Sequence, residues 1–131
     1  MAETELYQKG MKIRRQVLGD EYVDKALANS DEFSDDLQKL VTEYCWGASW
    51  GRGVLSLKQR SLNNLCLLSA LNRPHEFETH LRGAIRNGCT RDEIKETLLQ
   101  ITVYAGVPAG VDAFRIARKV LAEENAASPT R

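Results

Sequence analysis

Apolar residues recur along the chain at the three- and four-residue spacing of an amphipathic helix, and the two-residue alternation of a half-buried strand is not found. Glycine, proline and other turn residues divide this pattern into segments of about ten to eighteen residues. The predicted class is all-α, with about six to seven helices. The expected helices cover residues 3–18, 21–28, 34–46, 56–71, 74–87 and 90–104, and a last one follows residues 105–108 and ends near 124.

Residues at the expected helix ends support these boundaries. Gly19 is positioned to end the first helix, and Pro74 suits a first helical turn, where its missing N–H is no loss. Thr90 and Glu93 have the spacing of a capping box, in which each side chain accepts a hydrogen bond from the other residue's amide. A new helix is therefore expected to begin at Thr90.

The third expected helix carries four apolar residues on one face. We expect it to end at a break formed by Trp46 and Gly47, followed by a glycine-broken loop that carries both tryptophans of the chain and Arg52. The apolar face consists of Leu37, Leu40, Val41 and Tyr44.

The length of 131 residues predicts one domain, residues 1–131, with a flexible tail from about residue 124. Lysine plus arginine balance aspartate plus glutamate at 18 each, so the chain lacks the basic surface of a nucleic-acid or anionic-membrane binder. No apolar run approaches the ~20 residues that span a bilayer, and the acidic start at residues 1–5 does not resemble a signal peptide. We expect a soluble cytoplasmic protein.

Three cysteines, Cys45, Cys66 and Cys89, are widely spaced and form no Cys-x-x-Cys pair. Neither a disulfide framework nor a metal site is therefore expected. Cys66 lies in an apolar run and is interpreted as a packing residue, whereas a role for Cys45 beside Trp46 stays open.

The chain holds two histidines, and His80 follows Glu76 by one turn of the same expected helix face. This face carries an acid and a titratable base, while His75 at the helix start is interpreted as a surface residue. Together with the cluster of Glu43, Trp46, Trp50 and Arg52, His80 and Glu76 indicate a small-molecule site.

The order and spacing of these residues continue along most of the chain, from about residue 6 to 121. The pattern includes Glu43, Trp46, Gly47, Trp50, Arg52, Arg60, Ser61, Glu76, His80, Arg82, Asn87, Gly88, Glu93 and the segment Tyr104-Ala105-Gly106-Val107-Pro108-Ala109. In this pattern the chain resembles the carboxymuconolactone decarboxylase family.

The resemblance implies an alkylhydroperoxidase D-like helical fold and a homo-oligomer, a trimer or hexamer. It also implies conversion of 4-carboxymuconolactone to 3-oxoadipate enol-lactone, in the degradation of protocatechuate. The carboxylate of this lactone leaves from a carbon conjugated to the lactone carbonyl, so the substrate serves as its own electron sink. No cofactor is then required, and the partner expected is a lactone dicarboxylate.

On this interpretation His80 is the proton donor, because an unperturbed imidazole pKa of about 6.5 lets it hold and release a proton near neutrality. Glu76 orients His80 or binds its other nitrogen. Arg52 and Arg60 hold the two carboxylates, since a guanidinium offers paired donors. A solvated surface charge is the alternative for both arginines, and a packing residue is the alternative for His80.

Four further roles complete the predicted site. Trp46 and Trp50 wall the pocket and exclude water, or else belong to the core. Glu43 positions an arginine or assists proton transfer, with an exposed helix carboxylate as the alternative. Tyr104 donates a hydrogen bond to the developing oxyanion, or else packs.

The sequence departs from the family pattern at Gly51 and Gly53, which flank Arg52. In the family, proline is usual at the position after this arginine. Action on a different lactone or acid is therefore one alternative, and a binding paralogue without turnover is another. A thiol-dependent peroxidase using Cys45 or Cys89 is a third. It is disfavoured because Arg73 and Glu76 replace the cysteine pair of the peroxidase relatives and Ser61 replaces their relay glutamate.

Overall fold

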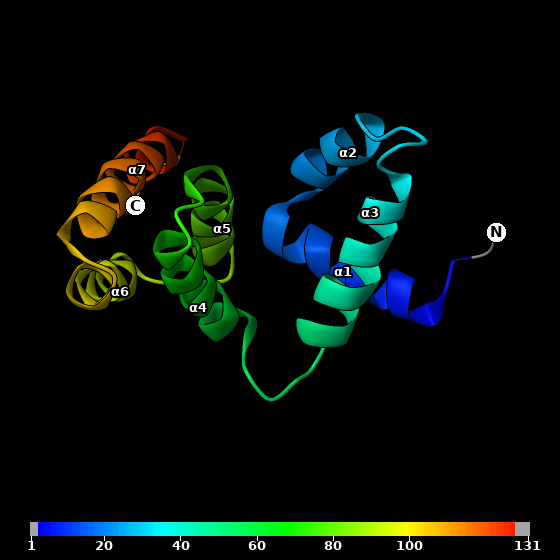
Figure 1. Cartoon of the computed structure of the whole chain (residues 1–131), viewed down its shortest axis with the longest axis horizontal. Coiled ribbons are helices and arrows are strands. Elements are labelled where there is room, and N and C mark those ends of the chain that lie inside the picture. The colour runs from blue at the N-terminus through cyan, green and yellow to red at the C-terminus, as the bar shows by residue number, and fades with distance from the viewer. Residues whose placement is uncertain (1–2, 128–131) are drawn as a thin grey trace. The chain divides into compact units, whose positions relative to one another are not determined.

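The computed structural model describes residues 3–127, with side chains to residue 124, and this part of the chain is all-α, as predicted. Seven α-helices and one π-helical segment, η1, follow one another without a strand in the described residues (Figure 1). The elements are α1 (Glu5–Leu18), α2 (Asp20–Ala28), α3 (Asp35–Leu40), η1 (Val41–Ser49), α4 (Leu57–Ala70), α5 (Pro74–Arg86), α6 (Arg91–Tyr104) and α7 (Val107–Ala127). Thr90 and Glu93 form the predicted capping box of α6.

The helices form two compact units, Met1–Leu57 and Lys58–Arg131, each with its own buried cluster. Burying these apolar side chains removes them from water and supplies most of the free energy that holds each unit together. The first cluster comprises Val17, Leu18, Val23, Trp46 and Trp50. The second comprises Leu65, Phe77, Leu81, Ala84, Cys89, Ile94, Leu98, Ile101, Ala113, Ala117 and Val120.

The predicted helix break at Trp46 and Gly47 is wrong. α3 continues directly into η1, where amides bond carbonyls five residues earlier, as Trp50 N does to Cys45 O at 2.9 Å. Position 47 requires a residue without a side chain because α1 crosses η1 closely there. A Cβ on Gly47 would lie 2.6 Å from the carbonyl oxygen of Leu6. The glycine thus permits a helix contact and does not interrupt the helix.

Arg14 joins α1 to the α3–η1 segment. Arg14 is 5% exposed, and its guanidinium donates to Thr42 Oγ1 at 3.2 Å and Gln38 Oε1 at 3.0 Å. Burial lowers the pKa of Arg14. Three of the four apolar side chains predicted to share one face are exposed: Leu37 and Leu40 on α3 and Tyr44 on η1.

α7 begins at Val107, within the expected break, because Pro108 falls in a first turn that needs no amide from it. The helix continues to Ala127, beyond the expected end near residue 124, and the remainder of the predicted tail lies outside the described residues. Within residues 3–127, no helix combines the length and apolar character needed to cross a membrane.

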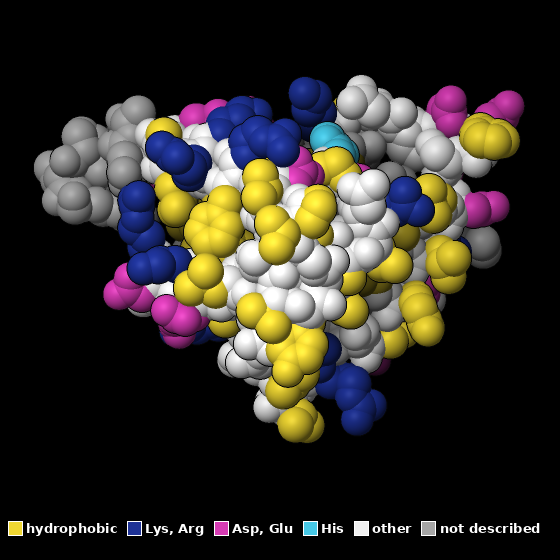
Figure 2. All heavy atoms as spheres, turned by 60° about the vertical axis from the view of Figure 1, so that its left-hand side comes forward, with side chains coloured by type: hydrophobic (Ala, Val, Ile, Leu, Met, Phe, Trp, Pro, Cys, Tyr) yellow, Lys and Arg dark blue, Asp and Glu magenta, His cyan; other side chains and the backbone are white. Residues whose placement is uncertain are grey.

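Exposed apolar side chains gather on one face of the second unit, over α6 and α7 (Figure 2). We call this surface the α6–α7 patch. It comprises Leu99, Val103, Tyr104, Val107 and Val111, which are 42–82% exposed.

Candidate functional site

α5 positions His80 beside the core of the second unit. Phe77, Leu81 and Ala84 recur at helical spacing and are buried, which fixes the rotation of the helix. His80 lies at the border of this buried stripe and is half-buried. A helix packed in this way holds the imidazole in a defined place.

The charged side of α5 is tied to α7. Arg82 donates to Glu78 Oε2 at 3.1 Å on its own helix and to Glu123 Oε2 at 2.6 Å on α7. Lys119 also reaches Glu78, with the two charged atoms 3.4 Å apart. These ion pairs add to the packing that keeps α5, and with it His80, in register with α7.

Burial lowers the pKa of His80 to about 4, and the nearby charge of Glu76 opposes this shift only in part. The imidazole is therefore neutral at pH 7 when no substrate is bound, which contradicts the expectation that it holds a spare proton near neutrality. Asn64 on α4 meets the ring, with its Nδ2 3.4 Å from His80 Nδ1. Nothing in the sequence connects these two residues, and Asn64 was not predicted as part of the site.

The other predicted residues of the second unit differ in exposure. Glu76 is exposed and lies one turn before His80, as expected. Arg60 is half-buried on α4, one turn before Asn64. Tyr104 is 82% exposed at the end of α6, so it does not pack within the second unit.

In the first unit, Trp46 and Trp50 are 3% and 5% exposed, with ring centroids 4.7 Å apart and planes tilted by 33°. They form part of this unit's core, which was one of the two roles considered for them. Glu43 is half-buried on η1 and accepts a hydrogen bond from Thr4 Oγ1 at 2.7 Å. Arg52 follows η1 in an exposed segment, where its amide donates to Ser49 O at 3.2 Å.

The eight predicted site residues thus divide between the two units. The first unit brings together Glu43, Trp46, Trp50 and Arg52 on η1 and the segment after it. The second holds Arg60, Glu76, His80 and Tyr104 on α4, α5 and α6.

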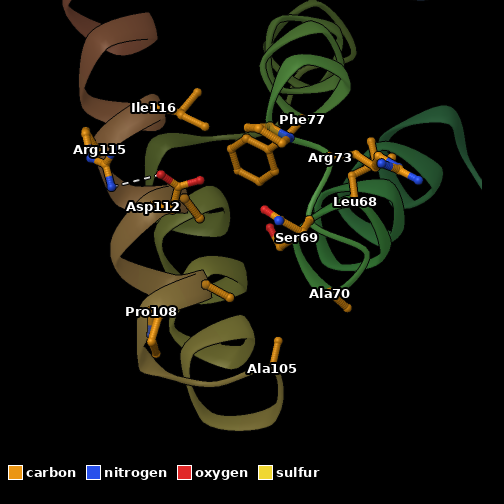
Figure 3. Close-up of a pocket in the computed structure, with 14 residues that line it drawn as sticks. Leu68, Ser69, Ala70, Arg73, Phe77, Ala105, Pro108, Asp112, Arg115 and Ile116 are labelled. Carbon is orange, nitrogen blue, oxygen red and sulfur yellow. Dashed lines mark ion pairs between the residues drawn. The ribbon is translucent and has the colours of Figure 1, made fainter.

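The second unit also contains a cavity of about 480 Å³, bordered by α4, α5 and α7 (Figure 3). Ser69 and Asp112 face it from opposite sides and Phe77 lies between them. Asp112 is paired with Arg115 at 2.8 Å. None of the eight predicted residues lines this cavity, so it is not the predicted site.

The three thiols are poorly suited to redox catalysis. Burial raises the pKa of Cys45 and of Cys66, and it raises the pKa of Cys89 to about 11. A thiol attacks peroxides as the thiolate, which is scarce at neutral pH when the pKa is raised. Ser61 is buried and accepts a hydrogen bond from Asn87 at 2.8 Å, so its hydroxyl is part of the packing of α4.

Comparisons with known proteins identify the family. The model of the carboxymuconolactone decarboxylase family matches residues 35–119. The chain is 38% identical over 120 residues to a 4-carboxymuconolactone decarboxylase of Acinetobacter baylyi, covering 92% of this chain and 90% of that protein. It is 42% identical over 116 residues to the nitrosuccinic acid decarboxylase npaB of Metarhizium robertsii, covering 88% of this chain and 81% of that protein.

The chain therefore belongs to the carboxymuconolactone decarboxylase family, as its residue pattern predicted. Both of these relatives are decarboxylases by name, and the enzyme class of the chain is a carboxy-lyase. Their names differ in the substrate, so family membership leaves the substrate to a separate argument.

Proposed function

We propose that this enzyme removes carbon dioxide from a small dianionic acid, with 4-carboxymuconolactone as the first candidate substrate. The observation that carries the proposal is the extent of the likeness to the Acinetobacter baylyi protein, which spans nearly the whole of both chains. The ordered set of Glu43, Trp46, Arg52, Arg60 and His80 supports it from the sequence.

The chemistry needs little beyond binding and proton delivery. The bond between the ring carbon and the carboxylate breaks, and its electron pair passes through the double bond to the lactone carbonyl oxygen as a dienolate. Protonation of the carbon next to that carbonyl then gives the enol-lactone. Arg52 and Arg60 hold the two carboxylates, and Tyr104 donates a hydrogen bond to the developing oxyanion.

His80 delivers the proton in this proposal. Because its pKa is about 4, it carries that proton at neutral pH only when the bound substrate stabilises the charged ring. A bound dianion favours the imidazolium because opposite charges stabilise each other at short range. Binding is therefore accompanied by uptake of a proton at His80, and Glu76 assists by placing a negative charge one turn away. Trp46 and Trp50 keep water from the reacting atoms, and Glu43 positions an arginine.

A second candidate substrate is nitrosuccinic acid, favoured by 42% identity to a protein named for its decarboxylation. Nitrosuccinic acid also has two carboxylates, and its nitro group can accept the electron pair that the departing carbon dioxide leaves behind. The same residues serve both reactions, because each substrate supplies its own electron sink. The glycines at positions 51 and 53 beside Arg52 are the first place to look for a preference between the two.

The test is to incubate the purified protein with each acid, without added metal or thiol, and to follow carbon dioxide release. We expect turnover of 4-carboxymuconolactone with formation of the enol-lactone, and a higher kcat/KM than for nitrosuccinic acid. A reversed preference would replace the first substrate by the second. Binding of both acids without carbon dioxide release would instead show a binding paralogue.

A control separates this reaction from thiol chemistry. Replacing Cys45, Cys66 and Cys89 together by alanine should leave decarboxylation within about twofold of the parent, because the proposed steps use no thiolate. A large loss of turnover in a folded triple variant would favour the thiol-dependent alternative.

A further inference from the structure

The contact between Asn64 and His80 joins two helices of the second unit. Asn64 on α4 precedes the fully buried Leu65 and is itself half-buried, and its Nδ2 lies 3.4 Å from His80 Nδ1 on α5. α5 is held in register by its buried stripe and by the ion pairs of Arg82, so the imidazole meets the amide in a fixed arrangement.

The pairing of Asn64 with the ring depends on which tautomer His80 adopts. With Nδ2 facing Nδ1 the amide donates to the ring, so the neutral ring in this arrangement carries its proton on Nε2. The side chain of Asn64 can also accept a hydrogen bond. A half-turn about its Cβ–Cγ bond places Oδ1 where Nδ2 was. Asn64 can then accept a hydrogen bond from Nδ1–H once the ring has gained a proton.

We propose that Asn64 is a positioning residue that holds the His80 ring in one orientation in both protonation states, so that the ring exchanges its proton with substrate in a fixed geometry. Its part in the reaction rests on the proposed function, whereas the contact with the ring does not. Leucine at this position has neither polar atom, and aspartate can only accept, which favours the charged ring.

Charged residues lie on each of the helices α4, α5 and α7. Glu76 acts on His80 from α5 and raises its pKa against the larger effect of burial. Arg60 stands one turn before Asn64 on α4. From α7, Lys119 and Glu123 are engaged in ion pairs with Glu78 and Arg82.

The experiment follows the two imidazoles by NMR as the pH changes. The chain has two histidines, so the exposed His75 is an internal reference for His80. Asn64→Asp is the test variant, and Asn63→Asp is its matched control, because the neighbouring Asn63 is exposed on the same helix and its amide oxygen is bonded to Gln59.

At pH 7, we expect the ring nitrogen shifts of the parent to show Nδ1 unprotonated and Nε2 protonated. Asn64→Asp should raise the pKa of His80 toward the unperturbed value of about 6.5, while Asn63→Asp leaves it near that of the parent. Equal effects of the two aspartates, or a proton on Nδ1 in the parent, would overturn the proposal.

A second variant tests the positioning without adding a charge. Asn64→Leu should yield a mixture of the two ring tautomers at pH 7, and kcat should fall about tenfold with KM within about twofold. An unchanged tautomer in folded Asn64→Leu would overturn the proposal even if Asn64→Asp failed to fold.

These readouts separate the two proposals. If the parent does not decarboxylate but the NMR results hold, the proposed function fails and the positioning of His80 by Asn64 stands. If the parent turns over and the NMR results are negative, the function stands and the role of Asn64 is refuted.

Discussion

At the scale of single residues, the environment of His80 sets its protonation state. An imidazole in water is half-charged near pH 6.5, but burial beside the core lowers the pKa of His80 to about 4. The sequence placed His80 and Glu76 one turn apart correctly, because helical spacing is local. It could not reveal the depth of burial or the contact with Asn64, because both depend on how α4 packs against α5.

The buried neutral imidazole predicts a pH-dependent stability. Between pH 4 and 6.5 the unfolded chain binds a proton at His80 and the folded chain does not, so stability falls as the pH decreases. The loss is absent above pH 6.5 and grows to about 3 kcal/mol when the pH falls to 4. Urea unfolding of His80→Gln should show a correspondingly flatter pH dependence.

His75→Gln is the control for this measurement, because His75 is exposed on the same helix. It should keep the pH dependence of the parent. Parallel curves for His80→Gln and the parent would show that His80 is charged or solvated in the folded state.

At the scale of elements, glycine is the residue type that sequence reasoning interpreted least well. Gly19 ends α1 with φ of 88°, as predicted, and Gly88 follows α5 with φ of 89°. Gly47 instead lies inside η1 because the backbone of α1 crosses there. A helix end can be inferred from neighbouring residues, whereas a close helix crossing depends on residues distant in the sequence.

This crossing predicts contrasting effects of two alanine substitutions. Gly47→Ala should lower the free energy of unfolding by about 1–3 kcal/mol, because its methyl would press on the Leu6 carbonyl. Gly53→Ala should change it by less than about 1 kcal/mol, since a Cβ there meets nothing within 4 Å.

Chemical denaturation of both variants measures the difference. If Gly47→Ala were more stable than the parent, the higher helix propensity of alanine would exceed the cost of the added methyl group. That result would mean that α1 and η1 do not approach closely.

At the scale of the whole molecule, the chain forms two compact units, each with its own core. Hydrophobic patterning identifies which side chains are buried but not which ones share a core. The single domain and the predicted homo-oligomer therefore stay predictions. The α6–α7 patch is one feature of the structure that bears on the oligomer, because contiguous exposed apolar surface commonly marks an interface.

If the patch joins copies of the chain, a charge within it should weaken their association. Val103→Lys, at a residue 75% exposed in the patch, should shift the mass measured by light scattering toward smaller species. Val54→Lys is the control, since Val54 is 86% exposed and lies outside the patch. An unchanged mass for Val103→Lys would exclude this surface as the interface.

The central claim is that this chain is a decarboxylase whose proton passes through His80. The most direct test is the rate of carbon dioxide release from 4-carboxymuconolactone by the parent, His80→Gln and His75→Gln, without added metal or thiol. Loss of a general acid predicts a decrease in kcat of about 10²- to 10⁴-fold for His80→Gln, and His75→Gln should stay within about twofold of the parent. Equal turnover by the parent and a folded His80→Gln protein would contradict the account.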